Sequence, residues 1–198
     1  FIQENDGEWI TKFEESGIPV LQDFSARKAT WNPVKKAGNI VRKLRTAQAY
    51  RRDGKGLLDA CGTYIRDALP GVQKIMLVGD DTTMGLYSGR AEASLAASGY
   101  AVTRFVFPHG EENKNLTTFA GLLEAMAAAG LTRTDCAVAL GGGVTGDLTG
   151  FAAACYLRGI RFVQIPTSLL AMVDSSVGGK TAVDLSAGKN LVGAFHEP

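Results

Sequence analysis

The sequence predicts an α/β protein with a Rossmann-like, doubly wound and mostly parallel sheet. Short apolar runs typical of buried strands alternate four times with longer helical patterns between residues 57 and 165. A glycine-rich turn follows the third of these strands, and polar residues follow the others. Because ligands of such sheets bind outside the carboxyl ends of the strands, we expect a site at these turns.

The individual elements follow from apolar periodicity and from glycine at their ends. Residues 57–69 carry apolar side chains at three- and four-residue spacing, which predicts a helix. Gly99 and Gly130 end the helices predicted at 84–97 and 116–129, since glycine readily adopts the left-handed backbone that closes a helix. A further buried helix is predicted at 148–157. The predicted strands are residues 74–78, 100–107, 136–140 and 161–165.

The glycine turn is the first candidate for a binding site. Gly141, Gly143 and Gly146 satisfy the pattern G-x-G-x-x-G between a strand and a helix. Such a turn offers unhindered backbone N–H groups to a pyrophosphate, although tight backbone packing explains the pattern equally well. The usual dinucleotide fingerprint also has an acidic residue about 20 positions on. Here the next strand ends in Pro166 and Thr167, so a dinucleotide is expected to bind differently from that of an ordinary Rossmann dehydrogenase.

Four polar residues downstream lie in glycine-rich sequence that is unfavourable for helices: Asp174, Lys180, Lys189 and Asn190. Lysines flanked by glycine suit an anionic substrate, because the ammonium groups attract phosphate and carboxylate while glycine lets the backbone approach closely. Two exposed loops with solvated lysines are the alternative. The position of all four residues behind a phosphate-type turn favours a site.

Composition excludes several classes of function. The 198 residues, 45% hydrophobic and 21% charged, are sufficient for one globular domain with a sizeable core. A formal charge of +1 gives no support to nucleic-acid or membrane-surface binding. No apolar run or secretory signal indicates a membrane or secreted protein, so a cytoplasmic protein is expected. Cys61, Cys136 and Cys155 lack metal or disulfide spacing, which predicts buried, reduced thiols.

The N-terminal part, residues 1–45, has no assigned role. Its basic stretch from Arg27 to Arg45 is compatible with a nucleic-acid arm, but a solvated linker or the remnant of a preceding segment is favoured. The chain begins with Phe1, which is compatible with a fragment.

The order of motifs in the last third of the chain resembles the 3-dehydroquinate synthases. Five strings similar to those of the family follow one another: GGGVTGD at 141–147, YLRG at 156–159, PTSLLAMVDSS at 166–176, GGKT at 178–181 and GKNLVGAF at 188–195. An ordered set of this kind is far more specific than any single motif. The resemblance continues more weakly upstream to about Lys74.

The resemblance implies an NAD-binding α/β domain at 46–198 and a set of site residues. The implied cofactor contacts are Asp80, Glu111, Lys114, Gly142, Gly143, Val144, Asp147, Thr167, Ser168, Lys180 and Lys189. The implied catalytic residues are Asp174, Lys180, Lys189, Asn190 and Arg158. Arg158 matches an arginine that reaches the substrate phosphate from a neighbouring subunit, so a homodimer is expected.

The resemblance also implies the reaction. In the family, 3-deoxy-D-arabino-heptulosonate 7-phosphate is converted to 3-dehydroquinate and phosphate, a step of the shikimate pathway towards chorismate and the aromatic amino acids. NAD is used without net consumption, so the enzyme is a phosphate-eliminating carbon–oxygen lyase. The small-molecule substrate would be the partner, with no nucleic acid and no membrane.

A metal site is expected outside this chain. The family uses zinc or cobalt, and its ligands lie in a helical C-terminal domain that would begin after Pro198. His109 and His196 lack metal-ligand spacing and are interpreted as loop or surface residues. Little or no synthase activity is therefore expected from this chain alone. The alternatives are another sugar-phosphate cyclase, a non-catalytic NAD-binding fragment and a metal-dependent polyol dehydrogenase.

Overall fold

A computed structural model describes residues 56–198, so the predictions for residues 1–45 lie outside the described part of the chain. Its first half contains α3 (Leu57–Ala68), β1 (Lys74–Asp80), α4 (Asp81–Ala97), β2 (Ala101–Phe107), η1 (Glu111–Asn113) and α5 (Leu116–Ala128). Its second half contains β3 (Cys136–Gly141), α6 (Gly143–Cys155), η2 (Tyr156–Arg158), β4 (Arg161–Pro166), η3 (Ala171–Ser175), β5 (Lys180–Leu185) and β6 (Gly188–Phe195).

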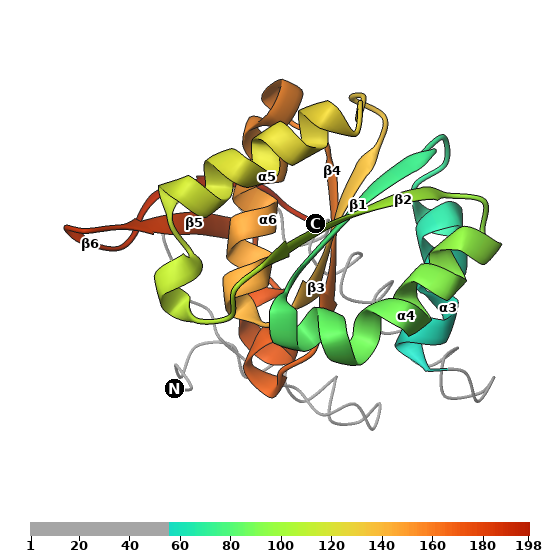
Figure 1. The fold of residues 1–198 in the computed structure, drawn as a ribbon, viewed down its shortest axis with the longest axis horizontal. Coiled ribbons are helices and arrows are strands. Elements are labelled where there is room, and N and C mark those ends of the chain that lie inside the picture. The colour runs from blue at the N-terminus through green and yellow to red at the C-terminus, as the bar shows by residue number, and fades with distance from the viewer. Residues whose placement is uncertain (1–55) are drawn as a thin grey trace, which may run out of the picture. The chain divides into compact units, whose positions relative to one another are not determined.

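Four strands form a parallel sheet in the order β2-β1-β3-β4 (Figure 1). The strand β1 lies centrally, with Ile75 opposite Val102 of β2 on one side and opposite Cys136 of β3 on the other. Each strand is followed by a helix or helical turn, as the sequence predicts. The predicted α/β fold with a parallel sheet is confirmed.

Helices cover both faces of this sheet because successive side chains of a strand point to opposite faces. Met76 and Val78 of β1 pack in a core with α5 and α6. Ile75 and Leu77 pack in a second core with α3 and α4. All four side chains are fully buried. The sheet is therefore shared by two cores, which explains why its central strands β1 and β3 are continuous apolar runs rather than alternating ones.

The helix ends follow local chemistry. The Asp80 carboxylate accepts a hydrogen bond from the backbone N–H of Thr83 at 2.8 Å and caps α4. Asn115 caps α5 in the same way. Gly99 and Gly130, with φ of 88° and 63°, lie just past the ends of α4 and α5. These glycine positions confirm the predicted ends of the two helices.

The helix predicted at 148–157 is displaced. It begins at Gly143 and ends at Cys155, because Gly142 adopts an extended conformation and the helical backbone starts immediately after it. Leu157 and Arg158 have φ of 50° and 66°, which is incompatible with the α-helix. Apolar periodicity missed the first turn of α6, since its glycines and Thr145 carry no large apolar side chain.

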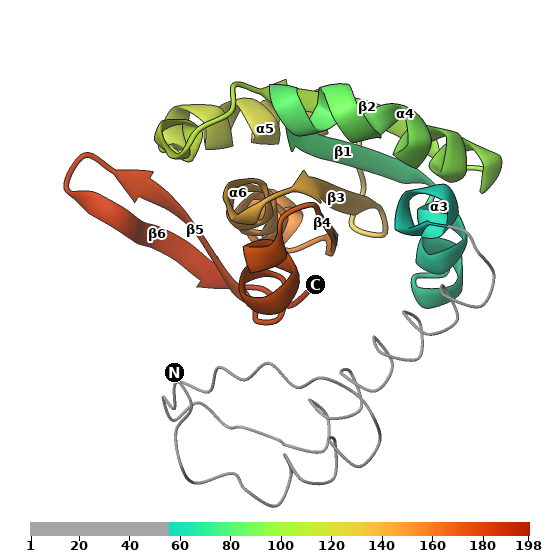
Figure 2. The same cartoon turned by 90° about the horizontal axis from the view of Figure 1, so that it is seen from below.

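The two exposed loops that the sequence left open as an alternative do not form after β4. A five-residue π-helical turn, η3, is followed by an antiparallel hairpin of β5 and β6 (Figure 2). The hairpin packs on α6, where Val183 is fully buried. Gly150 makes this approach possible, because a Cβ atom there would lie 2.4 Å from Thr181 Cγ2.

The cysteine prediction holds for two of the three residues. Cys61 and Cys136 are buried, whereas Cys155 at the end of α6 is exposed, and all three are free thiols. Burial raises the pKa of Cys136 to about 12. Within residues 56–198, every helix is too short or too polar to cross a bilayer.

Candidate active site

The carboxyl ends of β1, β3 and β4 meet around the glycine turn. Asp80 ends β1, and its second carboxylate oxygen lies 3.5 Å from the Thr145 hydroxyl on the first turn of α6. The backbone N–H of Thr167, just after β4, donates to the carbonyl oxygen of Gly141 at 3.0 Å. The predicted residues Asp80 and Thr167 thus lie on either side of the turn.

The turn leaves the N-terminus of α6 without a side-chain cap. Gly142 is the capping residue and has no side chain to accept the first N–H groups. Cβ atoms at Gly142 and Gly143 would lie 3.6 Å from Ser168 Oγ and 3.3 Å from Ser175 Oγ. The Ser175 hydroxyl has no hydrogen-bond partner within the described part of the chain. This small, polar space suits an anion, because the helix N-terminus carries a partial positive charge.

Val144, the next residue of the turn, differs from the two glycines because it carries an apolar side chain. Val144 is half-buried and packs against the core between α6 and the sheet, so its side chain helps to fix the helix while its backbone lies in the first turn of α6.

A second cluster, centred on Lys114, connects three segments that are distant in the sequence. Lys114 Nζ donates to Asn190 Oδ1 of β6 at 2.8 Å and lies 3.3 Å from Asp147 Oδ2 of α6. It also lies 3.1 Å from Glu111 Oε1 and 3.7 Å from Asp184 Oδ1. Only 4% of the Lys114 side chain is exposed. We call these five residues the Lys114 cluster.

Burial and charge act in opposite directions in this cluster. Burial by itself would lower the pKa of Lys114, but the hydrogen bond to Glu111 and the charge of Asp147 outweigh it, so the pKa is raised. Burial raises the pKa of Asp147, and Lys114 offsets only part of this effect. One ammonium group thus serves three carboxylates, and it has no free hydrogen-bonding capacity for a ligand.

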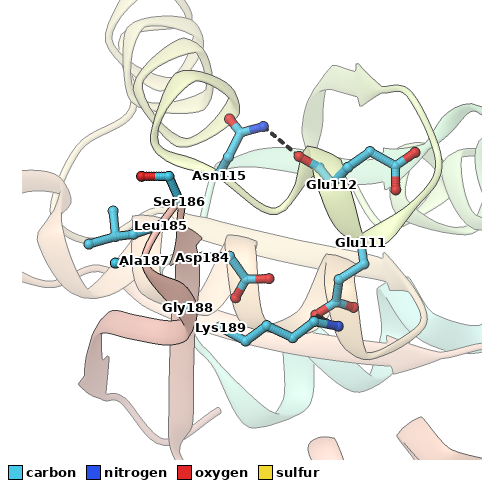
Figure 3. A pocket seen from close by; sticks show the side chains of 9 residues that line it. All are labelled: Glu111, Glu112, Asn115, Asp184, Leu185, Ser186, Ala187, Gly188 and Lys189. Atoms are coloured by element: carbon cyan, nitrogen blue, oxygen red, sulfur yellow. Dashed lines mark hydrogen bonds and ion pairs between the residues drawn. The ribbon is translucent and has the colours of Figure 1, made fainter.

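A pocket of about 560 Å³ opens beside the cluster, between η1 and the tip of the hairpin (Figure 3). Glu111 and Lys189 line it, with Lys189 Nζ 3.4 Å from Glu111 Oε1. Glu112, Asn115 and Asp184 also line it, and none of them was predicted from the sequence. None of the glycines of the turn lines this pocket, so the two candidate regions are adjacent but distinct.

Other predicted residues are not drawn into the cluster. Lys180 begins β5 and pairs with Phe195, at the opposite end of the hairpin from Lys189. Asp174 and Ser168 are exposed, and the Ser168 hydroxyl accepts from the backbone N–H of Ala171. Asp174 precedes Ser175, which places it close to the glycine turn.

Arg158 is the predicted residue farthest from the turn along α6. It is exposed and follows the C-terminal end of the helix, whereas the turn forms the N-terminal end. The length of α6, at about 1.5 Å per residue, separates the two.

The two histidines differ from each other. His109 is exposed, as predicted, and its Nδ1 lies 2.8 Å from Asp81 Oδ1, which raises the pKa of His109. His196 lies just after β6, outside the helices and strands, in agreement with the predicted loop or surface position. It is half-buried, stacks on Phe162 and lies 2.9 Å from the carbonyl oxygen of Ile160. Residues 56–198 place no three His, Cys, Asp or Glu side chains together as metal ligands.

Asp184 is the residue that sequence reasoning missed. Its carboxylate accepts a hydrogen bond from the backbone N–H of Asn190 at 2.7 Å, and its own N–H donates to the carbonyl oxygen of Lys114 at 2.8 Å. An aspartate before a tight turn is common in sequences, so only the fold reveals these contacts.

Comparisons with known proteins show which family the sequence resembles. The family model described as 3-dehydroquinate synthase N-terminal matches residues 104–198. The 3-dehydroquinate synthase of Symbiobacterium thermophilum is 51% identical over 145 residues, which cover 73% of this chain and 40% of that protein. This chain spans about 40% of the length of the curated relatives it matches.

Two solved structures of sugar-phosphate cyclases share the fold. A 2-deoxy-scyllo-inosose synthase complexed with carbaglucose-6-phosphate, NAD+ and Co2+ has a TM-score of 0.65 and 33% identity, over 69% of this chain and 38% of that one. A 2-epi-5-epi-valiolone synthase from Streptomyces hygroscopicus, with NAD+ and Zn2+ bound, has a TM-score of 0.62 and 34% identity, over 67% and 37%. Residues 104–198 of this chain therefore belong to the N-terminal domain of the 3-dehydroquinate synthase family.

Proposed function

We propose that this chain supplies the NAD-binding part of a 3-dehydroquinate synthase, with residues 46–198 as its α/β domain. The whole enzyme converts 3-deoxy-D-arabino-heptulosonate 7-phosphate to 3-dehydroquinate and phosphate. The observation that carries the proposal is the uncapped N-terminus of α6, with Gly142 and Gly143 at the carboxyl edge of the sheet. The family membership of residues 104–198 supports it.

The residues around the turn fit a pyrophosphate. The N–H groups of Gly143 and Val144 lie in the first turn of α6, where no side chain caps them. The absence of side chains at Gly142 and Gly143 leaves room for a phosphate against the backbone. The Ser168 and Ser175 hydroxyls flank the same space. NAD bound there would supply a transient oxidation of the substrate hydroxyl, and it would be regenerated by the end of the reaction.

The lysines divide into two roles in this proposal. Lys114 is enclosed by its cluster, so it orients Asp147 and Asn190 rather than meeting the ligand as a free cation. Lys180 and Lys189 are exposed and remain available to offset the phosphate and carboxylate of the substrate. Asp174 lies close to the turn, where it reaches the same substrate. Fixed positive charge then faces the group that leaves with the electron pair of the broken carbon–oxygen bond.

Arg158 acts on the substrate only from a neighbouring subunit in this proposal. It lies at the opposite end of α6 from the turn, which excludes a contact with a phosphate bound at the turn of its own chain. The active form is therefore proposed to be a homodimer, which analytical ultracentrifugation would detect.

A second candidate function is another sugar-phosphate cyclisation, because both solved structural relatives above are cyclases with other products. Product analysis separates the two. The chain is joined to the C-terminal part of the Symbiobacterium relative and given 3-deoxy-D-arabino-heptulosonate 7-phosphate. Formation of 3-dehydroquinate with one equivalent of phosphate supports the synthase. Turnover of a different sugar phosphate in its place supports the second candidate.

Calorimetric titration of NAD into the purified chain tests the site itself. We expect the parent to bind NAD and Gly143→Val to lose binding by at least about tenfold, because the new side chain fills the space beside Ser175. Gly89→Val is the matched control. Gly89 lies in α4, and a Cβ atom there has no neighbour within 4 Å.

The outcomes of this titration are distinct. Binding by the parent and by Gly89→Val, with loss in Gly143→Val, supports the turn as the pyrophosphate site. Equal binding by all three proteins places NAD elsewhere. No binding by a folded parent contradicts the proposal for this chain.

A further inference from the structure

Asp184 is a carboxylate near the tip of the β5–β6 hairpin that connects this tip to the rest of the site through both its backbone and its side chain. Its backbone forms an isolated parallel bridge with Asn115, in which the Asp184 N–H donates to the carbonyl oxygen of Lys114. Its side chain is 16% exposed and lies on the wall of the pocket, facing Glu111 (Figure 3). Asp184 thus contacts both the segment that carries Lys114 and the strand that carries Asn190.

The backbone conformation of Asn190 is one that a contact from Asp184 can stabilise. Its φ is 56°, in the left-handed region that is unfavourable for most residues other than glycine. The Asn190 N–H donates to Asp184 Oδ1 at 2.7 Å, which stabilises that conformation. In the same conformation Asn190 Oδ1 accepts the 2.8 Å hydrogen bond from Lys114. One hydrogen bond therefore sets the direction of the next.

We propose that Asp184 is the positioning residue of the site: it holds Asn190 in the left-handed conformation that presents its side-chain oxygen to Lys114. The cluster then keeps Lys114 beside Asp147 and holds the hairpin tip, with Lys189, against η1. The consequence for ligand binding rests on the proposed function, whereas the conformation of Asn190 does not.

The distances indicate which property of Asp184 matters. The contact from its Oδ1 to Lys114 Nζ is 3.7 Å, longer than the contacts that Lys114 makes with Glu111 and Asp147. The contact to the Asn190 N–H is short and direct. An acceptor oxygen is therefore needed at this position, and asparagine offers one in the same place while alanine offers none.

Hydrogen exchange at the Asn190 amide tests this directly in the free chain. We expect slow exchange in the parent and in Asp184→Asn, and exchange about tenfold faster or more in Asp184→Ala, because the acceptor is lost. Ser186→Ala, at the exposed hairpin turn, is the matched control and should match the parent. The Leu140 amide in the centre of the sheet reports folding and should be equally protected in all four proteins.

The same proteins are then titrated with NAD. Weaker binding in Asp184→Ala, restored in Asp184→Asn, supports a positioning role, since a role based on charge would not be rescued. Equal protection of Asn190 in Asp184→Ala overturns the inference, and so does an Asp184→Asn variant that behaves like alanine. If the parent binds no NAD, the proposed function fails, while the exchange of the Asn190 amide still decides the role of Asp184.

Discussion

At the scale of single residues, Asp135 shows how one buried carboxylate can join two connections of the sheet. It is 2% exposed and precedes β3. One oxygen accepts from the backbone N–H groups of Gln73 and Lys74, and the other accepts from the N–H and hydroxyl of Thr132. Burial alone would raise the pKa of Asp135, but these hydrogen bonds outweigh it, and the pKa lies below its usual 3.8.

Because the pKa of Asp135 is lowered in the folded state, the free energy of unfolding depends on pH. The contribution of Asp135 is fully present above pH 3.8, where the unfolded side chain is also ionised, and it is lost as the pH falls through the lower folded pKa. We expect Asp135→Asn to lower the free energy of unfolding at pH 7 by about 1–3 kcal/mol, because its amide N–H₂ faces the donors of Thr132.

Urea unfolding at pH 7 and pH 3 measures the effect. The difference between the parent and Asp135→Asn should shrink at pH 3, because the unfolded parent binds a proton there more readily than the folded parent does. Asp67→Asn is the control, since the Asp67 side chain is 70% exposed. A difference that stays constant with pH would show that Asp135 contributes through packing and not through its charge.

At the scale of elements, the same substitution by alanine is expected to have opposite effects on stability at two helical glycines. A Cβ atom at Gly150 would meet Thr181 Cγ2 at 2.4 Å and Phe162 Cε1 at 2.9 Å, where α6 packs between the hairpin and β4. A Cβ atom at Gly85 in α4 would meet nothing within 4 Å. The same substitution therefore tests close packing at one site and helix propensity at the other.

We expect Gly150→Ala to destabilise the chain by about 1–3 kcal/mol, because the helix and the hairpin must move apart. Gly85→Ala should stabilise it by about 0.5–1 kcal/mol, since alanine loses less conformational entropy in a helix than glycine. Denaturant unfolding monitored by far-UV circular dichroism measures both. A stabilised Gly150→Ala would mean that the hairpin does not pack on α6 in solution.

At the scale of the described unit, both cores depend on the same sheet. Met126 lies in the core beneath α5 and α6, and Leu95 lies in the core beneath α4, on the other face. Alternate residues of β1 and β3 belong to each core, so disruption of these strands on one face also removes packing from the other face.

We therefore expect Met126→Ala to weaken both faces equally. Deleting this fully buried side chain should lower the global free energy of unfolding by about 2–5 kcal/mol. Native-state hydrogen exchange should show the same loss of protection at Leu95 on α4 as at Leu148 on α6. Loss confined to the α5–α6 face would contradict a single cooperative unit.

Features that depend on near neighbours in the chain could be predicted from the amino-acid sequence alone. Apolar runs predicted the four strands, Gly99 and Gly130 predicted two helix ends, and the alternation of strand and helix predicted a parallel sheet with polar residues at its carboxyl edge. These follow from local backbone preferences and from the two periodicities of side-chain direction, which need no knowledge of distant contacts. The ordered motifs also identified the family, which the comparisons confirm.

The grouping of the site residues, in contrast, depends on contacts between distant parts of the chain. Lys114, Asp147 and the hairpin residues Asp184 and Asn190 come from three separate segments, and no local pattern indicates that one ammonium group serves three carboxylates. The hairpin was missed for the same reason: glycine-rich sequence favours loops locally, and β5 and β6 form because Val183 and Thr181 are buried against α6. The position of Arg158 beyond the far end of that helix likewise depends on where α6 starts and stops. Long-range burial and pairing decided these points, because they stabilise conformations that the local sequence does not favour by itself.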